Sequence, residues 1–153
     1  MVPTVVSNVI ENNSYTGIWF NNSTITIENN LISSNALYGV VAINTSSPNI
    51  YQSTMSYNGR YGAVAAWSST PRFALPDWSY PGNNLIKNNV TYGIFVRDAT
   101  PFLGSTDSYG GQIGGGNSIF GHDGANDYNI RVDVNFQSTI IDAEHTWWGT
   151  TSE

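Results

Sequence analysis

The sequence predicts an all-β protein whose fold is a right-handed parallel β-helix, or β-solenoid, of about six coils with about 22 residues each. Three observations favour this fold. An Asn is followed four residues later by a Gly and then by an alternating apolar run, and this phrase recurs along the chain. Its glycines, Gly17, Gly39, Gly62 and Gly93, follow one another after 22, 23 and 31 residues. Each repeat also contains three short runs with the two-residue period of strands, and helix-favouring Glu and Lys are scarce.

The three runs of each repeat define the strands expected in one coil. The first run covers residues 3–5, 25–27 and 48–50 in successive repeats. The second run begins nine residues before the repeat glycine, and the third directly follows that glycine. Asn, Gly, Ser or Pro separates the runs, as expected of tight turns. Strands of successive coils would then lie about 4.8 Å apart, as neighbours in a parallel sheet do.

The same register places similar residues above one another in columns. Stacked Asn amides form hydrogen bonds along such a column, and Asn also tolerates the left-handed backbone of a tight turn. The repeat glycines indicate either a backbone with positive φ or one without space for a Cβ atom. The expected turn ladder consists of Asn13, Asn35, Asn58 and Asn89 with Gly17, Gly39, Gly62 and Gly93, beside a second column of Asn8, Asn30, Ser53 and Asn84.

Two insertions interrupt the repeat, at residues 68–81 and 104–116. The first carries several aromatic residues, and the second is rich in Gly, which favours a flexible or tightly turned surface loop. The pattern resumes at Asn117, and the last coil includes residues 138–143. We expect residues 1–153 to form a single β-helix domain. Because the sequence opens in the middle of a coil, we also expect it to be a fragment of a longer chain.

The composition narrows the classes of partner and location. The net charge is −6, and the five basic residues are scattered, whereas nucleic-acid binding needs clustered Lys and Arg. We therefore expect no nucleic-acid partner. No apolar stretch approaches the roughly 18 residues of a membrane span, and the absence of Cys excludes disulfides and thiolate metal sites.

An outward row of apolar residues is the main candidate binding surface. In the strand after each repeat glycine, the first and third residues are expected to face the core, so the second residue points outward. Exposed apolar patches usually mark an interface. Three interpretations remain open: the 68–81 insertion covers the row, a partner protein or a second copy binds it, or a sugar stacks on it. The candidate interface residues are Trp19, Val41, Val64, Phe95, Trp67, Phe73, Trp78 and Tyr80.

Nearly the whole chain resembles the right-handed parallel β-helix repeats of the pectate-lyase-like superfamily. It is most similar to the repeats of bacterial and archaeal surface proteins and of NosD-type periplasmic proteins. The resemblance rests on the Asn-x-Ile…Asn-x-x-x-Gly-Ile coil, on Pro101-Phe-Leu-Gly104 before the Gly-rich insertion and on Trp147-Trp148-Gly149. Those surface proteins often close a β-helix with Asn-Trp-Trp-Gly, and Thr146 takes the place of that Asn here. The resemblance implies the fold, but this fold serves lyases, hydrolases, adhesins and inert spacers.

Acidic and basic residues in register provide weak catalytic candidates. Arg97 and Asp133 are expected to stack on adjacent coils, and Asp98 lies beside them. A lyase needs carboxylates that hold Ca²⁺ and a nearby Lys or Arg base, and a glycosidase needs two carboxylates about 5–10 Å apart. A surface ion pair between Arg97 and Asp133 explains the same residues without catalysis. No complete catalytic constellation is visible, so the sequence favours a protein that is not an enzyme.

Metal and modification sites have equally simple alternatives. Asp123 and Asp127 offer oxygen ligands for Ca²⁺, but their segment lacks the order of a calcium loop, and turn chemistry explains it equally well. We therefore expect no cofactor. His122, His145, Met1 and Met55 are far apart in the register, which argues against a transition-metal site. Sequons for N-linked glycans begin at Asn12, Asn21, Asn22, Asn44 and Asn89.

The resemblance implies an extracellular or cell-surface location, with the periplasm as a second one. Together with it, the sequence predicts an extracellular structural or adhesive module. In this interpretation a rigid rod presents its loops and its aromatic row for contact with a ligand or with a second copy, end to end or side by side. The alternative is a module that binds or degrades a cell-surface polysaccharide, as a lyase or a glycosidase. Unpaired strand edges at the ends of a β-helix favour pairing with further strands, which is why self-association is among the expected partners.

Overall fold

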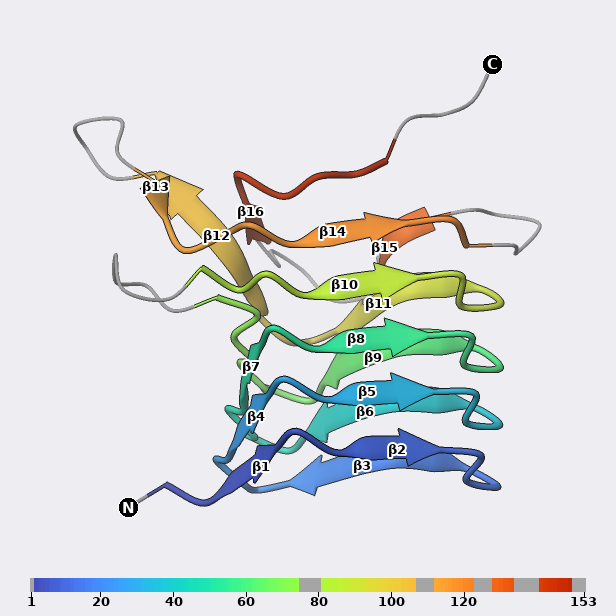
Figure 1. Cartoon of the computed structure of the whole chain (residues 1–153). Helices are drawn as coiled ribbons and strands as arrows, with labels where there is room; N and C mark the ends of the chain where they lie inside the picture. Colours follow the sequence, from blue (N-terminus) through green and yellow to red (C-terminus); the bar gives the residue numbers. More distant parts are fainter. Residues whose placement is uncertain (1, 75–80, 107–111, 123–127, 134–140, 150–153) are drawn as a thin grey trace.

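The computed structural model of the chain describes residues 2–74, 81–106, 112–122, 128–133 and 141–149. Within these ranges it contains sixteen strands, β1 to β16, and no helix. The described residues therefore include no helix that could cross a membrane. Figure 1 shows the strands wound into a stack of coils that rises from the N-terminus. The expected all-β parallel β-helix is confirmed, since the paired strands are parallel except for β12 with β13.

Three parallel sheets run along the stack, and each of the first three coils contributes one strand to each sheet. The first sheet has the order β1-β4-β7, formed by Thr4–Val6, Thr26–Glu28 and Asn49–Tyr51. The second has the order β2-β5-β8-β10-β14, formed by Val9–Glu11, Leu31–Ser33, Thr54–Ser56, Leu85–Lys87 and Ser118–Phe120. The third has the order β3-β6-β9-β11-β15, formed by Thr16–Asn21, Tyr38–Ile43, Tyr61–Ala66, Tyr92–Arg97 and Tyr128–Val132.

The later coils continue the first sheet with less regular pairing. Arg72 forms isolated parallel bridges to Asn49 below and to Phe102 above. The strands β12 (Phe102–Thr106) and β16 (Asp142–Ala143) then pair in parallel. In the second sheet, Trp147 bridges to Ser118 of β14. These pairings give six coils, of which the last is incomplete, and they agree with the number expected from the repeat.

Both insertions contribute residues to the regular structure of the β-helix. In the first, Phe73 is only 1% exposed and packs in the core, because Arg72 beside it pairs within the first sheet. Residues 75–80 lie outside the described part of the chain. In the second, residues 102–106 form β12, which pairs antiparallel with β13 (Gln112–Ile113). The expectation of a loop beginning at Gly104 was therefore wrong, since Gly104 lies within a strand.

The core lies between the three sheets and consists of one side chain in two along each strand. Ile27 and Ile50 from the first sheet meet Ile32, Met55 and Ile86 from the second, and all five side chains are fully buried. The third sheet contributes the residues that the sequence assigned to the interior. Those are Val40, Ala42, Ala63, Ala65, Ile94 and Val96, with Phe20 and the partly buried Ile18 in the first coil.

A continuous ladder of Asn side chains connects the coils at the corner between the second and third sheets. The Nδ2 of Asn35 donates to the Oδ1 of Asn58 at 3.0 Å, and the Nδ2 of Asn58 donates to the Oδ1 of Asn89 at 2.9 Å. The Oδ1 of Asn58 also accepts a hydrogen bond from the backbone N–H of Asn35. The Nδ2 of Asn58 also donates to the carbonyl oxygen of Ile32. Each interior amide is therefore fully hydrogen-bonded although it is buried, as such groups must be.

The ladder begins at Asn13 and ends at a histidine. Asn13 donates its Nδ2 to the Oδ1 of Asn35 at 2.8 Å, and the backbone N–H of Asn89 donates to the Nδ1 of His122 at 3.3 Å. The second column is present at the corner between the first and second sheets. It runs through Asn8, Asn30, Ser53 and Asn84 and extends to Asn117.

The left-handed backbone lies one residue earlier than expected. The ladder asparagines do not have positive φ; the residue directly before each of them does, as at Ser34, Tyr57 and Asn88. The turn residue therefore reverses the chain, and the following Asn points inward to satisfy the backbone groups of that corner. The proposed role of the ladder Asn in the left-handed turn is thus corrected, whereas its hydrogen-bonding role is confirmed.

The glycine column is explained by close packing between coils. None of Gly17, Gly39, Gly62 and Gly93 has positive φ. A Cβ atom on Gly62 would lie 2.8 Å from the carbonyl oxygen of Gly93 and 2.8 Å from the Nδ2 of Asn89. The column continues to Asn129, whose carbonyl oxygen would lie 2.5 Å from a Cβ atom on Gly93. Of the two explanations left open by the sequence, the structure selects the lack of space.

We predict that Asn58→Ala lowers the free energy of unfolding by about 3 kcal/mol or more, because it leaves several buried partners without a hydrogen bond. The matched change Asn13→Ala, at the exposed start of the ladder, should cost less than about 1 kcal/mol. Urea unfolding followed by circular dichroism measures both values. Equal effects at the two positions would contradict the role of the buried ladder.

We also predict that Gly62→Ala destabilises the fold by about 2 kcal/mol or more, because the added methyl group overlaps the next coil. Asn129→Ala provides the control, since this column position already carries a Cβ atom and, among the described residues, its amide bonds only the carbonyl of Trp148 at the exposed surface. The control should cost less than about 1 kcal/mol. Thermal unfolding of both variants tests the difference, and a Gly62→Ala protein as stable as wild type would exclude the close-packing explanation.

Candidate functional site

The outer face of the third sheet contains the candidate site. Register stacks the outward residues of its strands in rows along the β-helix. The middle row runs through Trp19, Val41, Val64 and Phe95 and then reaches Arg131. Large rings thus stand at the first and fourth coils, and two small valines lie between them. This sequence of large, small, small and large side chains creates a hollow.

The hollow is a pocket of about 340 Å³. Its floor is aliphatic and consists of Val41, Val64, Ile43 and Ala66. Trp19 and Phe95 line it from the first and fourth coils. The remaining lining residues are Tyr15, Tyr38 and Tyr61 at the start of the strands, and Trp67, Arg60 and Arg97.

A column of stacked tyrosines bounds the pocket. The ring centroids of Tyr38 and Tyr61 are 5.3 Å apart with an interplanar angle of 24°, and those of Tyr61 and Tyr92 are 5.2 Å apart at 10°. Phe95 stacks on Tyr61 at 5.2 Å, and Tyr128 extends the column. Because the rings face one another along the β-helix axis, their positions are fixed by packing before any ligand binds.

Arginine side chains lie against these rings. The Cζ of Arg60 is 5.4 Å from the centroid of Tyr61, and that of Arg97 is 5.5 Å from Phe95. Arg131, one coil further along, is 5.5 Å from Tyr128. Cations over aromatic faces are attracted by the negative ring face. The outer face of the third sheet therefore holds three guanidinium groups in defined positions.

Burial and the charge of Arg60 have opposite effects on the pKa of Tyr61. Burial raises the pKa of the Tyr61 hydroxyl above its usual value, whereas the Arg60 charge lowers it, and the neighbouring Tyr38 and Tyr92 hydroxyls add to the rise. The net direction is upward. Tyr61 is thus held in its neutral form at the edge of the pocket.

The structure separates the candidate interface residues into four groups. Trp19 and Trp67 are exposed, at 48% each, and Val64 and Phe95 are partly exposed, all four lining the pocket. Val41 also lines it but is only 2% exposed, because Tyr38, Val64, Ile43 and Ala66 pack around it. Its prediction as an exposed residue was wrong.

Two further groups complete this comparison. Phe73 belongs to the core and is excluded from any surface site. Trp78 and Tyr80 lie outside the described residues. The part of the 68–81 insertion that the structure describes pairs with the first sheet and does not line the pocket, so the expected cover over the row is not formed by these residues.

The tyrosine column was missed by the sequence interpretation. Its signal was present, because Tyr directly precedes the repeat glycine at positions 38, 61 and 92. The prediction rested on the aromatic residues two positions after the glycine and on those in and near the 68–81 insertion. Since vertical neighbours in a β-helix carry equivalent residues, any aromatic residue that recurs at one repeat position indicates a ring stack.

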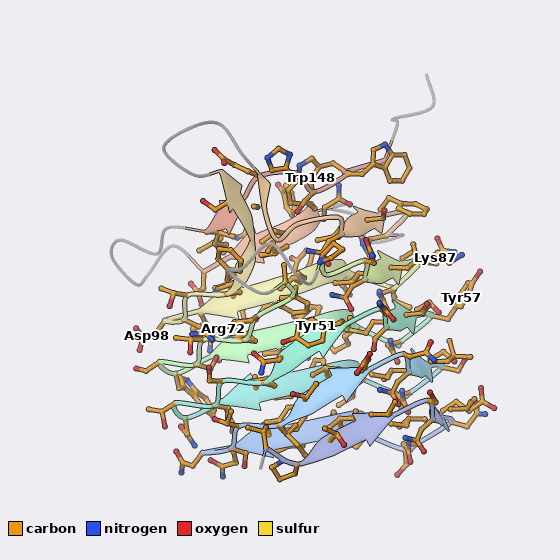
Figure 2. The ribbon with its side chains drawn as sticks, turned by 60° about the vertical axis from the view of Figure 1, so that its left-hand side comes forward. Tyr51, Tyr57, Arg72, Lys87, Asp98 and Trp148 are labelled. Carbon is orange, nitrogen blue, oxygen red and sulfur yellow. The ribbon has the colours of Figure 1, made fainter. Side chains whose placement is uncertain are left out.

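The acidic and basic candidates form one ion pair. Arg97 and Asp133 are neighbours on adjacent coils, with Nε and Oδ2 2.8 Å apart and side-chain exposures of 43% and 15%. The expected stacking is confirmed, and a half-exposed pair of this kind contributes at most about 1 kcal/mol. Asp98 has positive φ and lies exposed at the corner after β11, and Figure 2 shows it at the edge of the stack. No interaction in the described chain joins Asp98 to Asp133.

The metal candidates gain no geometric support. Asp123 and Asp127 lie outside the described residues, as does Met1. Met55 is buried in the core, and His122 ends the Asn ladder, which explains both residues by packing and hydrogen bonding. His145 is exposed with positive φ. Within the described ranges no three His, Cys, Asp or Glu side chains gather to form a metal site.

The sequons differ in accessibility. Asn12, Asn21 and Asn22 are exposed, and the partly exposed Asn44 donates its Nδ2 to the Oδ1 of Asn21 at 2.9 Å. Asn89 is completely buried and its Nδ2 donates to the carbonyl of Met55. A glycan on Asn89 would break the ladder, so this residue is removed from the acceptor candidates.

Comparison with known proteins supports the fold. Residues 2–137 match the family model described as a right-handed β-helix region. No curated protein and no solved structure matches the chain. The match covers most of the chain and includes every residue of the pocket.

The raised pKa of Tyr61 predicts a loss of stability at alkaline pH. Above about pH 10 the tyrosine of the unfolded chain deprotonates first, so the unfolded state binds fewer protons and the free energy of unfolding falls until the folded-state pKa is passed. Tyr61→Phe should reduce this fall. Urea midpoints measured from neutral pH to above about pH 10 test the prediction. Identical pH profiles of the two proteins would show that Tyr61 is not responsible.

Proposed function

Because the chain belongs to the right-handed β-helix family, we propose that it is a rigid β-solenoid module that binds a partner molecule in the aromatic pocket of its third sheet. The observation that carries this proposal is the pocket itself. Its volume of about 340 Å³ lies within the range of ligand sites, and its wall is held in place by ring stacking. Preorganised walls reduce the entropic cost of binding.

The residue types of the pocket favour recognition of another molecule. Trp, Tyr and Arg are the residues most enriched at the energetic centres of interfaces. All three occur here around an aliphatic floor. The half-exposed Trp19 and Trp67 leave apolar surface in contact with water, and a bound partner would remove that surface from water.

Binding is a better proposal than turnover. The described lining contains no Asp or Glu, and Asp133, the nearest acid in register, is paired with Arg97. General acid–base chemistry on a glycan needs a pair of carboxylates at the reacting bond. The lyase and glycosidase interpretations of Arg97, Asp98 and Asp133 therefore have weaker support than a binding role.

A different molecule is a better proposed partner than a second copy of the same face. In a two-fold symmetric contact between these faces, the face of one copy that carries Arg60 and Arg131 would meet the equally basic face of the other. Like charges across an interface are unfavourable. The adhesive function proposed here is therefore the capture of another molecule.

Polysaccharide binding is the second candidate. The exposed indole rings of Trp19 and Trp67 favour it, since flat aromatic faces suit the apolar faces of sugar rings. The tyrosine column offers less free ring face to a sugar, because the faces of Tyr38, Tyr61 and Tyr92 already stack on one another. An extracellular or cell-surface location, or a periplasmic one, would suit both candidates and rests on the resemblance to surface and periplasmic repeat proteins.

We predict that Val64→Phe abolishes binding by filling the hollow between Trp19 and Phe95. The side chain of Val64 points away from the core, and Phe95 shows that a phenyl ring is accommodated in the same row, so the fold should persist. Labelled protein is applied to printed arrays of random peptides and of glycans. Spots that bind the wild type should weaken at least about tenfold with Val64→Phe, which corresponds to about 1.4 kcal/mol.

Trp148→Ala provides the matched control. Trp148 is 40% exposed on the last coil and does not line the pocket, and Figure 2 shows it at the end of the stack. This variant should bind every spot as the wild type does. Binding that survives Val64→Phe unchanged, or an array without any spot sensitive to that substitution, would contradict a function of the pocket.

A further inference from the structure

We propose that the ligand of the pocket is an acidic peptide segment of a partner protein that inserts one apolar side chain between Trp19 and Phe95. This inference rests on the proposed function and adds the class of partner. It follows from three features of the described residues: the short hollow between Trp19 and Phe95, the aliphatic side chains at its floor and the excess of positive charge around it.

The shape suits a single side chain. Along the β-helix axis the pocket extends over the two valines of the middle row, and Trp19 and Phe95 stand at its ends. A volume of about 340 Å³ lies at the small end of ligand sites. An extended polymer that ran along the row would collide with the rings of Trp19 and Phe95. A single side chain that enters perpendicular to the sheet would fit between these two rings.

The floor suits an apolar group. The side chains of Val41, Val64, Ile43 and Ala66 are aliphatic, and Val41, Ile43 and Ala66 form a small buried cluster of their own. A sugar hydroxyl placed against these side chains would lose its water without gaining a hydrogen bond from them, which costs about 1–3 kcal/mol in proteins. An aromatic or aliphatic side chain loses nothing of this kind and buries apolar surface.

The charge around the pocket suits an acidic segment. Arg60, Arg97 and Arg131 lie on the outer face of the third sheet, and the only acid that the structure places in its rows is Asp133. Asp133 pairs with Arg97, and Asp98 lies at the neighbouring corner. Arg60 and Arg131 have no carboxylate partner in the described residues. Three of the five basic residues of a chain with net charge −6 are thus concentrated on one face.

The positions of these cations are defined. The Arg60 guanidinium lies over the Tyr61 ring, and its Nη1 is 3.4 Å from the hydroxyl of Tyr38. Arg131 lies over the Tyr128 ring, in the middle row directly after Phe95. Arg60 therefore lines the pocket, and Arg131 lies one coil beyond the end of the pocket at Phe95. Carboxylates on both sides of an inserted side chain would reach both, which favours a segment with acids before and after its apolar residue.

The experiment measures the affinity of purified protein for four probes by fluorescence anisotropy. The first is a short synthetic peptide with one central Trp and Asp on both sides. The second replaces its Trp by Gly, the third replaces its Asp by Lys, and the fourth is an oligouronate of the same charge as the first. Each probe is tested with wild type, Val64→Phe and the double variant Arg60→Glu, Arg131→Glu. Lys87→Glu is the control, because Lys87 belongs to β10 of the second sheet and does not line the pocket.

We expect the acidic Trp peptide to bind best. Replacing its Trp by Gly or its Asp by Lys should weaken binding at least about tenfold, and so should Val64→Phe and the double arginine variant. Lys87→Glu should bind as wild type, and added salt should weaken binding because the charges are solvent-exposed. Circular dichroism confirms that each variant is folded, so that a loss of binding reports on the surface alone.

The opposite outcomes are distinct. If the Lys-flanked Trp peptide binds equally well and Val64→Phe still blocks it, the pocket is a binding site but the acidic segment is wrong. If the oligouronate binds more tightly than the peptide and is blocked by Val64→Phe, the ligand is an acidic glycan. If no probe is sensitive to Val64→Phe, this inference is overturned, and the array experiment decides separately whether the pocket binds anything at all.

Discussion

The hydrogen bonds that connect one coil to the next are the constraint on which the rest of the structure depends. Backbone groups pair along the three sheets, and the amides of Asn35, Asn58 and Asn89 connect the corners where the chain turns. A slip of one residue would break both Asn columns and turn the core side chains outward. Register in this protein is therefore specified at the corners as well as in the strands.

The same register builds the candidate site. Because each coil repeats the one below, a Tyr that recurs before the repeat glycine produces a stack of rings. A row whose residues differ in size from coil to coil produces an uneven surface. The hollow arises where that row changes from Trp19 to two valines and back to Phe95. A β-helix thus forms a rigid hollow from differences between equivalent residues of successive coils.

The chemistry of the pocket comes from contrast with the rest of the chain. The protein is acidic overall, yet arginine side chains lie against its aromatic column, since guanidinium groups pack on ring faces. The surrounding surface would repel an acidic partner, and the pocket face would attract it. Such a field directs a partner toward one side of the rod. The family fold alone does not provide this selectivity, which depends on the residues of the site.

The sequence by itself determined the coil, its three strands, the two Asn columns, the inward and outward residues of the third strand, and the pairing of Arg97 with Asp133. All of these follow from spacing, because a fixed repeat fixes vertical neighbours. Tertiary structure alone decided what lies beside each residue within a coil and how the insertions join the sheets. It buried Val41 beneath its neighbours, placed Phe73 in the core, assigned the left-handed turns to the residues before the ladder and paired β12 antiparallel with β13. These outcomes depend on the directions in which side chains and insertions leave the coil, and those directions are set by lateral packing that residue spacing does not encode.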